Sequence, residues 1–216
     1  MKLYHFTTAQ FGLEAVRDER LKIALINELN DPFELSNLVL NSAQRKKWRE
    51  WKTKIGKTHG LVCLSTTWKH PLLWSHYADK HKGMCLGFEV SANVIFSPVE
   101  YSATKLTLKD LGFNSLNELD EPAMQKILFT KWKAWEYELE YRAFVNLDQK
   151  DPVNGHYFIK FAPALKLCQV ILGQRSDISR ARIENILGKP ADDIEYFKSR
   201  SGVHHFEIVE NKDRRS

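Results

Sequence analysis

Apolar runs of strand length and segments with helical spacing follow one another in this chain without a regular order. Residues 61–65, 84–90 and 169–172 are apolar runs of strand length, whereas residues 9–20 place apolar side chains at helical spacing. The order shows no repeated strand–helix–strand unit, so a sheet with regular crossover helices is not expected. The mixture predicts an α+β fold, which these 216 residues can form as one domain over residues 1–216.

Four segments carry more specific predictions of secondary structure. Residues 34–51 have the spacing of a helix, and so do residues 176–187. Residues 139–145 have the pattern of a strand. Residues 105–131 are polar with leucines at helical spacing, which predicts a helical insert at about 105–131.

The composition predicts a soluble protein. The hydrophobic fraction of 43% suffices for a core, and no apolar stretch approaches the length that crosses a bilayer. The first residues lack the apolar run of a signal peptide, so we expect a cytoplasmic protein without a membrane partner. Cys63, Cys85 and Cys168 lie in apolar runs, which predicts buried free thiols. The pair His204-His205 has no evident third ligand, and no metal is expected.

The net charge of +5 is concentrated in one segment, residues 44–59. Trp48 and Trp51 lie among its cations, and this combination can contact phosphates and stack on bases. The favoured alternative is a solvated helix whose two tryptophans pack on the core. The cations that would contact nucleic acid are Arg45, Lys46, Lys47, Arg49, Lys52 and Lys54.

Four polar-aromatic motifs carry the groups that could perform chemistry. They are LYHFTT at residues 3–8, NDPFE at 30–34, LWSHYADKHKGMCLGFE at 73–89 and WEYELEYR at 135–142. Each places a reactive side chain beside residues that favour strands or turns: His5, Asp31, Tyr77 or Glu140. An imidazole, a phenol and a carboxylate from separate segments can together hold a nucleotide and polarise one of its bonds.

Each of these residues also has a structural interpretation. His5 can bond to a nearby carbonyl, and Tyr77 can fasten its short helix to a sheet together with Trp74. The NDPFE motif can begin a helix, with Asp31 as cap and Glu34 closing a capping box, or it can border a ligand pocket.

The EYELEYR segment offers a carboxylate to a developing positive charge. In an extended chain Glu138, Glu140 and Arg142 share one face, and the arginine would keep a neighbouring carboxylate ionised. Such a carboxylate beside an oxocarbenium ion is what cleavage of a glycosidic bond requires. The alternative is an exposed strand face with a Glu–Arg pair.

Taken together, the motifs resemble an uncharacterised bacterial domain family. Its members show LYH followed by Tyr or Phe and Thr, an NDPFE turn, a WSHYA block with His, Gly and Cys, a block ending in EYR, and a VILG strand. The resemblance covers most of the chain except residues 105–131 and the tail. That family is in turn remotely similar to the ADP-ribosyltransferase fold, which implies a split β-sheet core with peripheral helices.

The resemblance implies roles for individual residues. In the poly(ADP-ribose) polymerase-like branch, a His of the first strand contacts ribose, a Tyr on a short helix stacks on nicotinamide, and a Glu of a later strand orients the ribose hydroxyl. His5, Tyr77 and Glu140 match these catalytic positions, although Glu138 fits almost as well as Glu140. The wider set for binding NAD comprises His5, Thr7, Ser65, Ser75, Tyr77 and Arg142, with Asp31 and Glu138 as further pocket candidates.

Three functions are therefore open. The first is an NAD-dependent ADP-ribosyltransferase or NAD glycohydrolase, which acts as a toxin or phage-defence effector on protein or nucleic acid and takes NAD as substrate. The second is a catalytically inactive module of the same fold that binds a nucleotide or nucleic acid. The third, a nuclease that holds a metal with Asp31, Glu34, Glu138 and Glu140, requires these carboxylates to converge, and their distribution gives no sign of it.

Overall fold

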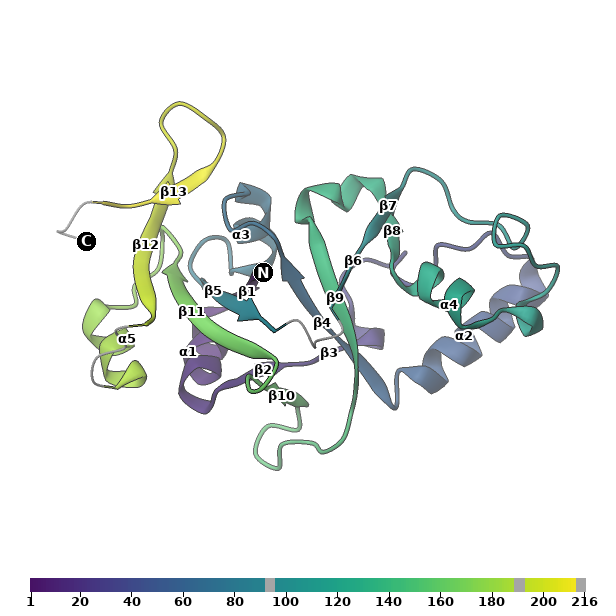
Figure 1. Cartoon of the computed structure of the whole chain (residues 1–216), viewed down its shortest axis with the longest axis horizontal. Helices are drawn as coiled ribbons and strands as arrows, with labels where there is room; N and C mark the ends of the chain where they lie inside the picture. The colour runs from purple at the N-terminus through teal and green to yellow at the C-terminus, as the bar shows by residue number, and fades with distance from the viewer. Residues whose placement is uncertain (92–95, 189–192, 213–216) are drawn as a thin grey trace. The chain divides into compact units, whose positions relative to one another are not determined.

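The computed structural model describes residues 1–91, 96–188 and 193–212 (Figure 1). It is an α+β protein, as the sequence predicts, and its main sheet is mixed. The chain divides into two compact units. Met1–Lys22, Leu64–Val94 and Phe158–Ser216 form what we call the terminal unit, and Ile23–Cys63 with Ile95–Tyr157 form the internal unit. The single domain over residues 1–216 stays a prediction.

The terminal unit is built on a sheet in which successive neighbours are β13, β12, β11, β5 and β1. β11 and β12 run parallel, and the other pairs are antiparallel. His5 of β1 lies opposite Leu86 of β5, and on its other side β1 meets the end of β4 at Tyr4 and Ser65. The strands are β1 (Lys2–Thr7), β5 (Met84–Val90), β11 (Leu165–Leu172), β12 (Glu195–Ser201) and β13 (Ile208–Glu210), and of β4 (His59–Ser65) the residues Leu64 and Ser65 belong to this unit.

Helices pack on both faces of this sheet. α1 (Ala9–Asp18) begins at Thr8, whose hydroxyl accepts from the backbone N–H of Phe11, and its Gly12 lies against Met84. α3 (Pro71–Tyr77) has proline in its first turn, and its Trp74 meets Phe6 edge to face at 5.2 Å. The remaining elements are β2 (Arg20–Lys22), β10 (Phe158–Lys160), which pairs with β2, and α5 (Arg180–Leu187).

The internal unit combines short strand pairs with two helices. Trp48 of α2, Leu38 and Ile127 of α4 form its buried core cluster. β3 pairs with β4, β6 pairs with β9, and β7 runs parallel to β8. The elements are β3 (Ala24–Leu25), η1 (Ile26–Glu28), α2 (Ser42–Ile55), β6 (Ser97–Pro98), β7 (Glu100–Ser102), η2 (Leu116–Glu118), α4 (Glu121–Leu128), β8 (Thr130–Trp132), η3 (Lys133–Glu138) and β9 (Glu140–Asn146).

Four of the predicted segments differ from the structure. The helix expected over 34–51 begins only at Ser42, because Asn41 and Gln44 form a capping box there. The strand expected over 139–145 begins at Glu140, since Leu139 is left-handed with φ of 45° and the residues before it form η3. The helix expected over 176–187 begins at Arg180 after the cap Ser179. In the stretch 105–131 α-helix is confined to Glu121–Leu128.

The loop that precedes β5 approaches the end of β11 so closely that only glycine fits there. A Cβ atom on Gly173 would lie 2.1 Å from the carbonyl oxygen of His81, and the Gly173 N–H donates to the carbonyl of Gly83 at 2.9 Å. We expect Gly173→Ala to lower the free energy of unfolding by about 1–3 kcal/mol, because the loop backbone must move. Urea denaturation measures the loss.

Gly56→Ala is the comparison for this variant. The nearest atom to an added Cβ at residue 56 belongs to the mobile end of the Asn27 side chain, at 3.1 Å. This variant should lose clearly less stability than Gly173→Ala. Equal losses in the two variants would show that the backbone approach at Gly173 is not the cause.

Candidate functional site

The structure brings the four sequence motifs together in two pairs. LYHFTT and the WSHYA block meet in the terminal unit, where Phe6 contacts Trp74 and His5 lies opposite Leu86. NDPFE and EYR meet in the internal unit, where Arg142 Nη1 donates to Glu34 Oε1 at 2.7 Å across 108 positions of sequence. The motifs therefore form two local clusters, one in each unit.

The site residues expected in the terminal unit lie on neighbouring elements. His5 and Thr7 are half-buried on β1, and Ser65 is buried at the end of β4, where its hydroxyl accepts from the Thr67 N–H at 3.1 Å. Tyr77 is half-buried at the end of α3. Because side chains alternate along a strand, β1 directs His5 away from the face on which Phe6 meets α3.

A histidine that is not among the predicted site residues contacts one of them, Ser75. His81 Nε2 is 3.1 Å from the exposed Ser75 hydroxyl, and the imidazole stacks on Trp74 with ring centroids 6.4 Å apart. Burial lowers the pKa of His81, and Arg175 lowers it further. The backbone of Asp79, Lys80 and His81 is left-handed, a conformation that often marks functional sites. The DKH sequence directly after the helix was the feature of the sequence that could have pointed to His81.

The site residues expected in the internal unit form a buried ion cluster. Arg142 holds Glu140 with two parallel hydrogen bonds of 2.8 Å, from Nε and Nη2, and reaches Glu34 with Nη1. Lys131 Nζ contacts Glu140 at 3.1 Å and Glu34 at 3.5 Å, and it also donates to Glu138. All five side chains are buried, so this cluster anchors the unit from within.

The cluster contains three carboxylates and two cations, which leaves one negative charge. Burial alone would raise the pKa of Glu140, but Arg142 and then Lys131 outweigh it and lower that pKa to about 2. The pKa of the neighbouring Cys63 thiol is raised, by burial first and then by Glu140. Glu140 is thus a fixed anion whose two oxygens are both occupied by cations.

The NDPFE motif forms a turn and does not begin a helix. The Asp31 carboxylate accepts from the Phe33 N–H at 2.8 Å, and the Glu34 N–H bonds to the Asp31 carbonyl at 3.0 Å. Leu35 follows with φ of 54°. The turn directs Glu34 into the ion cluster and leaves Phe33 exposed.

A pocket of about 340 Å³ lies beside the ion cluster in the internal unit. Lys131 belongs to both. Phe33 and Trp132 line the pocket; each residue is 53% exposed, and the ring centroids lie 6.5 Å apart. Lys105, a further lining residue, holds its ammonium 5.3 Å from the centre of the Phe33 ring. The pocket therefore combines an aromatic wall with a cation.

Asn37 also lines this pocket. Its Nδ2 donates to the carbonyls of Ile127 and Thr130 at 2.7 and 2.9 Å. Its Oδ1 is buried and has no hydrogen-bond partner among the described residues. The sequence did not reveal this residue, because Asn37 fell in the segment for which a helix was expected.

A second pocket in the internal unit is basic. It measures about 410 Å³, and its lining includes Arg45, Arg49, Trp48 and the same Lys105. Trp48 is buried, donates to the Leu35 carbonyl at 2.7 Å and stacks on Trp51. The expectation that these tryptophans pack on the core is confirmed. Nucleic-acid contact by the cations of this helix stays a prediction.

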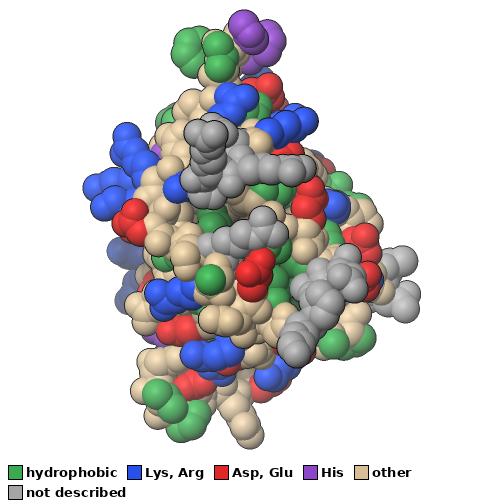
Figure 2. Space-filling view, turned by 90° about the vertical axis from the view of Figure 1, so that its left-hand side faces the viewer, with side chains coloured by type: hydrophobic (Ala, Val, Ile, Leu, Met, Phe, Trp, Pro, Cys, Tyr) green, Lys and Arg blue, Asp and Glu red, His purple; other side chains and the backbone are tan. Residues whose placement is uncertain are grey.

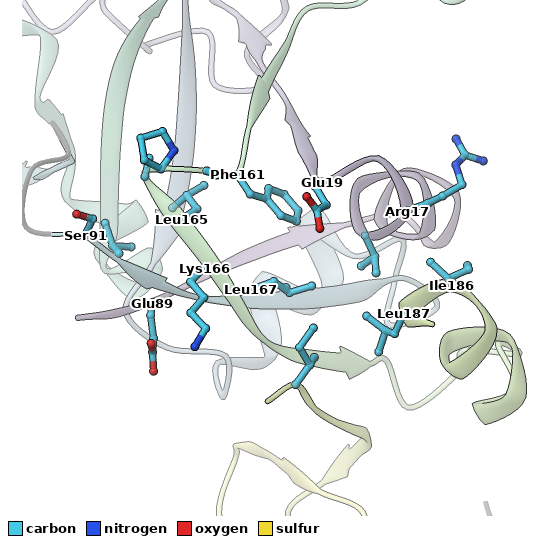
Figure 3. A pocket seen from close by; sticks show the side chains of 16 residues that line it. Arg17, Glu19, Glu89, Ser91, Phe161, Leu165, Lys166, Leu167, Ile186 and Leu187 are labelled. Atoms are coloured by element: carbon cyan, nitrogen blue, oxygen red, sulfur yellow. The ribbon is translucent and has the colours of Figure 1, made fainter. Parts of the chain in front are cut away.

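The largest of these pockets, about 660 Å³, lies in the terminal unit. Figure 3 shows the apolar side chains of Leu165, Leu167 and Leu187 among those that line it, together with Arg17 and Glu19. None of the residues that the sequence analysis selected lines this pocket. We therefore assign no function to it.

No family model, curated protein or solved structure matches the chain. The resemblance to the uncharacterised bacterial family, and through it to ADP-ribosyltransferases, consequently stays a prediction. So does the convergence of His5 and Tyr77 of the terminal unit with Glu140 of the internal unit.

The other expectations concern cysteines, metals and membranes. Cys85 and Cys168 are buried free thiols as predicted, and Cys63 is a half-buried one. His204 and His205 are exposed near the end of the β12–β13 hairpin, where histidine and hydrophobic side chains gather in Figure 2. Within the described ranges no three His, Cys, Asp or Glu side chains are grouped to hold a metal ion. No helix in these ranges has the length and apolarity to cross a membrane.

Proposed function

We propose that the internal unit binds a nucleotide, with its base in the 340 Å³ pocket lined by Phe33, Asn37, Lys105, Lys131 and Trp132. The volume falls in the range of small-molecule sites, about 300–1,000 Å³. The observation that carries the proposal is the buried Asn37 oxygen without a partner, beside two aromatic rings that stay exposed. An aromatic wall and one directional polar group are the elements that recognise a flat heterocycle.

The aromatic wall supports stacking. Phe33 and Trp132 leave about half of their surface in water, although large apolar rings are ordinarily buried. A base that covers the indole face removes this surface from water. Stacking of this kind contributes about 1–3 kcal/mol per base.

The polar groups support a particular class of base. The Asn37 oxygen can only accept, and the carboxylates around Lys131 leave the adjoining cluster with a negative charge. A base with an exocyclic amino group, such as adenine or cytosine, or a carboxamide such as that of nicotinamide, donates to this oxygen. Lys105 at the aromatic wall is then available to a phosphate.

The experiment is calorimetric titration of the chain with AMP and with IMP, which differ in the amino or oxo group of the base. We expect AMP to bind roughly five- to tenfold more tightly than IMP, since one hydrogen bond is worth about 1 kcal/mol. Trp132→Ala should weaken AMP binding at least ~10-fold. Phe206→Ala, which removes a fully exposed ring outside the pocket, is the control and should leave binding unchanged.

Two results would reject the nucleotide site. One is no heat of binding with AMP, CMP or NAD at about millimolar concentration. The other is AMP binding that Phe206→Ala weakens as much as Trp132→Ala does, because the binding surface would then lie elsewhere.

NAD contains both an adenine amino group and a nicotinamide carboxamide, so it belongs to the proposed ligand class. Transfer or hydrolysis of its ADP-ribose would be a further activity, supported only by the motif resemblance. Glu140, the carboxylate that the resemblance assigns to this activity, has both oxygens bound to Arg142. Nicotinamide release from NAD, measured with and without DNA, RNA and protein acceptors, tests this activity, and its absence throughout would exclude it. A toxin or phage-defence role and the cytoplasmic location stay predictions.

A further inference from the structure

We propose that the nucleotide is part of a single-stranded nucleic acid, whose sugar-phosphate backbone continues into the basic pocket lined by Arg45, Arg49 and Lys105. This inference rests on the proposed function, because it places one base in the aromatic pocket. It adds a second subsite for phosphate and names the partner as a polymer.

The two pockets have shared and adjacent lining residues. Lys105 lines both of them. Ser36 lines the basic pocket, and the next residue, Asn37, lines the aromatic pocket. In the arrangement that we propose, the ligand passes Lys105 between the aromatic pocket and the basic pocket.

The basic pocket presents cations that carboxylates have not neutralised. Arg45 and Arg49 are exposed and four residues apart, so they share one face of α2. Arg45 Nη2 donates to the Ser42 hydroxyl at 3.2 Å, and within the described ranges neither guanidinium has a carboxylate at ion-pair distance. Ser42 is the first residue of α2 and also lines the pocket, so the positive end of the helix dipole adds to the attraction of an anion.

The aromatic pocket and the basic pocket together favour binding of a single strand over binding of a duplex. The aromatic pocket takes the face and amino edge of a base, and in a duplex these are stacked and paired. A groove of cations beside a stacking platform is the usual arrangement of proteins that bind single strands. An acidic peptide would satisfy the arginines and leave the aromatic wall and the Asn37 oxygen unused.

The test measures fluorescence anisotropy of labelled oligoadenylates of about 12 nucleotides, within the ~4–16 that such sites cover. DNA and RNA forms, a duplex of the same length and polyglutamate as competitor are compared. We expect the single strands to bind at least ~10-fold more tightly than AMP, with affinity that falls as salt rises. The DNA and RNA arms show which polymer is preferred.

Two double variants on the same helix separate the subsites. Arg45→Gln with Arg49→Gln should weaken oligonucleotide binding at least ~10-fold and reduce the salt slope by about 1–2, while AMP affinity changes less than ~2-fold. Lys46→Gln with Lys47→Gln removes the same charge from exposed positions outside the pocket lining and should have the smaller effect.

The outcomes are distinguishable. If AMP binds but the single strands bind no more tightly, the polymer is excluded and the nucleotide site stands. Equal losses in the two double variants would show nonspecific attraction to the helix and overturn the subsite, as would equal affinity for duplex or displacement by polyglutamate. If AMP itself does not bind, the proposed function fails together with this inference.

Discussion

Replacing Arg142 by methionine should lower the free energy of unfolding by about 3–5 kcal/mol. The guanidinium is 1% exposed and donates to Glu140 twice, to Glu34 and to the Leu128 carbonyl. Methionine fills much of the volume but leaves both carboxylates buried with Lys131 as their remaining cation. An uncompensated buried charge is among the most destabilising changes that a single substitution can make.

Urea denaturation of three proteins measures this effect. Arg142→Lys keeps the charge without the two-pronged geometry and should fall between wild type and Arg142→Met. Arg17→Met removes an exposed arginine that pairs with the neighbouring Asp18 and should change stability little. If Arg142→Met cost no more than Arg17→Met, the cluster would not be the anchor that its contacts indicate.

Acid should destabilise the protein through Glu140. Burial raises the pKa of Glu140, but Arg142 and Lys131 outweigh burial and lower the pKa from its usual value of 4.5 to about 2. A lowered pKa stabilises the folded state fully above pH ~4.5, and this contribution is lost as the pH falls to about 2. The shift corresponds to roughly 3 kcal/mol, which makes it the second-largest effect that we expect.

Unfolding free energies measured between pH 7 and pH 2 in wild type and Glu140→Gln provide the check. The variant is less stable at pH 7, because glutamine cannot balance Arg142. The gap between the two proteins should narrow as the pH falls from about 5 to about 2, because the wild-type carboxylate becomes neutral as well. A constant gap over that interval would mean that Glu140 does not titrate with a lowered pKa.

The sequence predicted best those elements that depend on nearby residues. β5 occupies residues 84–90 as expected, because a run of apolar residues there is buried in the sheet. α1 occupies Ala9–Asp18, within the segment 9–20 for which helical spacing was predicted. The predicted start of α2 was wrong. The NDPFE motif favours a helix locally, but Glu34 instead accepts a hydrogen bond from the buried Arg142.

The sequence predicted the candidate site less completely than it predicted these elements. The motifs drew attention to Glu138, Glu140 and Arg142, and the structure places all three in one cluster. Lys131 and Asn37 carry no local signal, because a lysine in a polar stretch and an asparagine in an expected helix look ordinary. Their importance comes from what surrounds them: three carboxylates around Lys131, and no partner for the Asn37 oxygen.

The amino-acid sequence by itself determined the α+β class, the apolar strands and the four motifs, because strand alternation, capping and turn preferences act over a few residues. Only the tertiary structure decided that Glu34 would meet Arg142 across 108 positions, and that Phe33 and Trp132 would stay exposed beside Asn37. Such arrangements depend on the balance between burial and charge pairing among distant segments, and local sequence does not contain that balance.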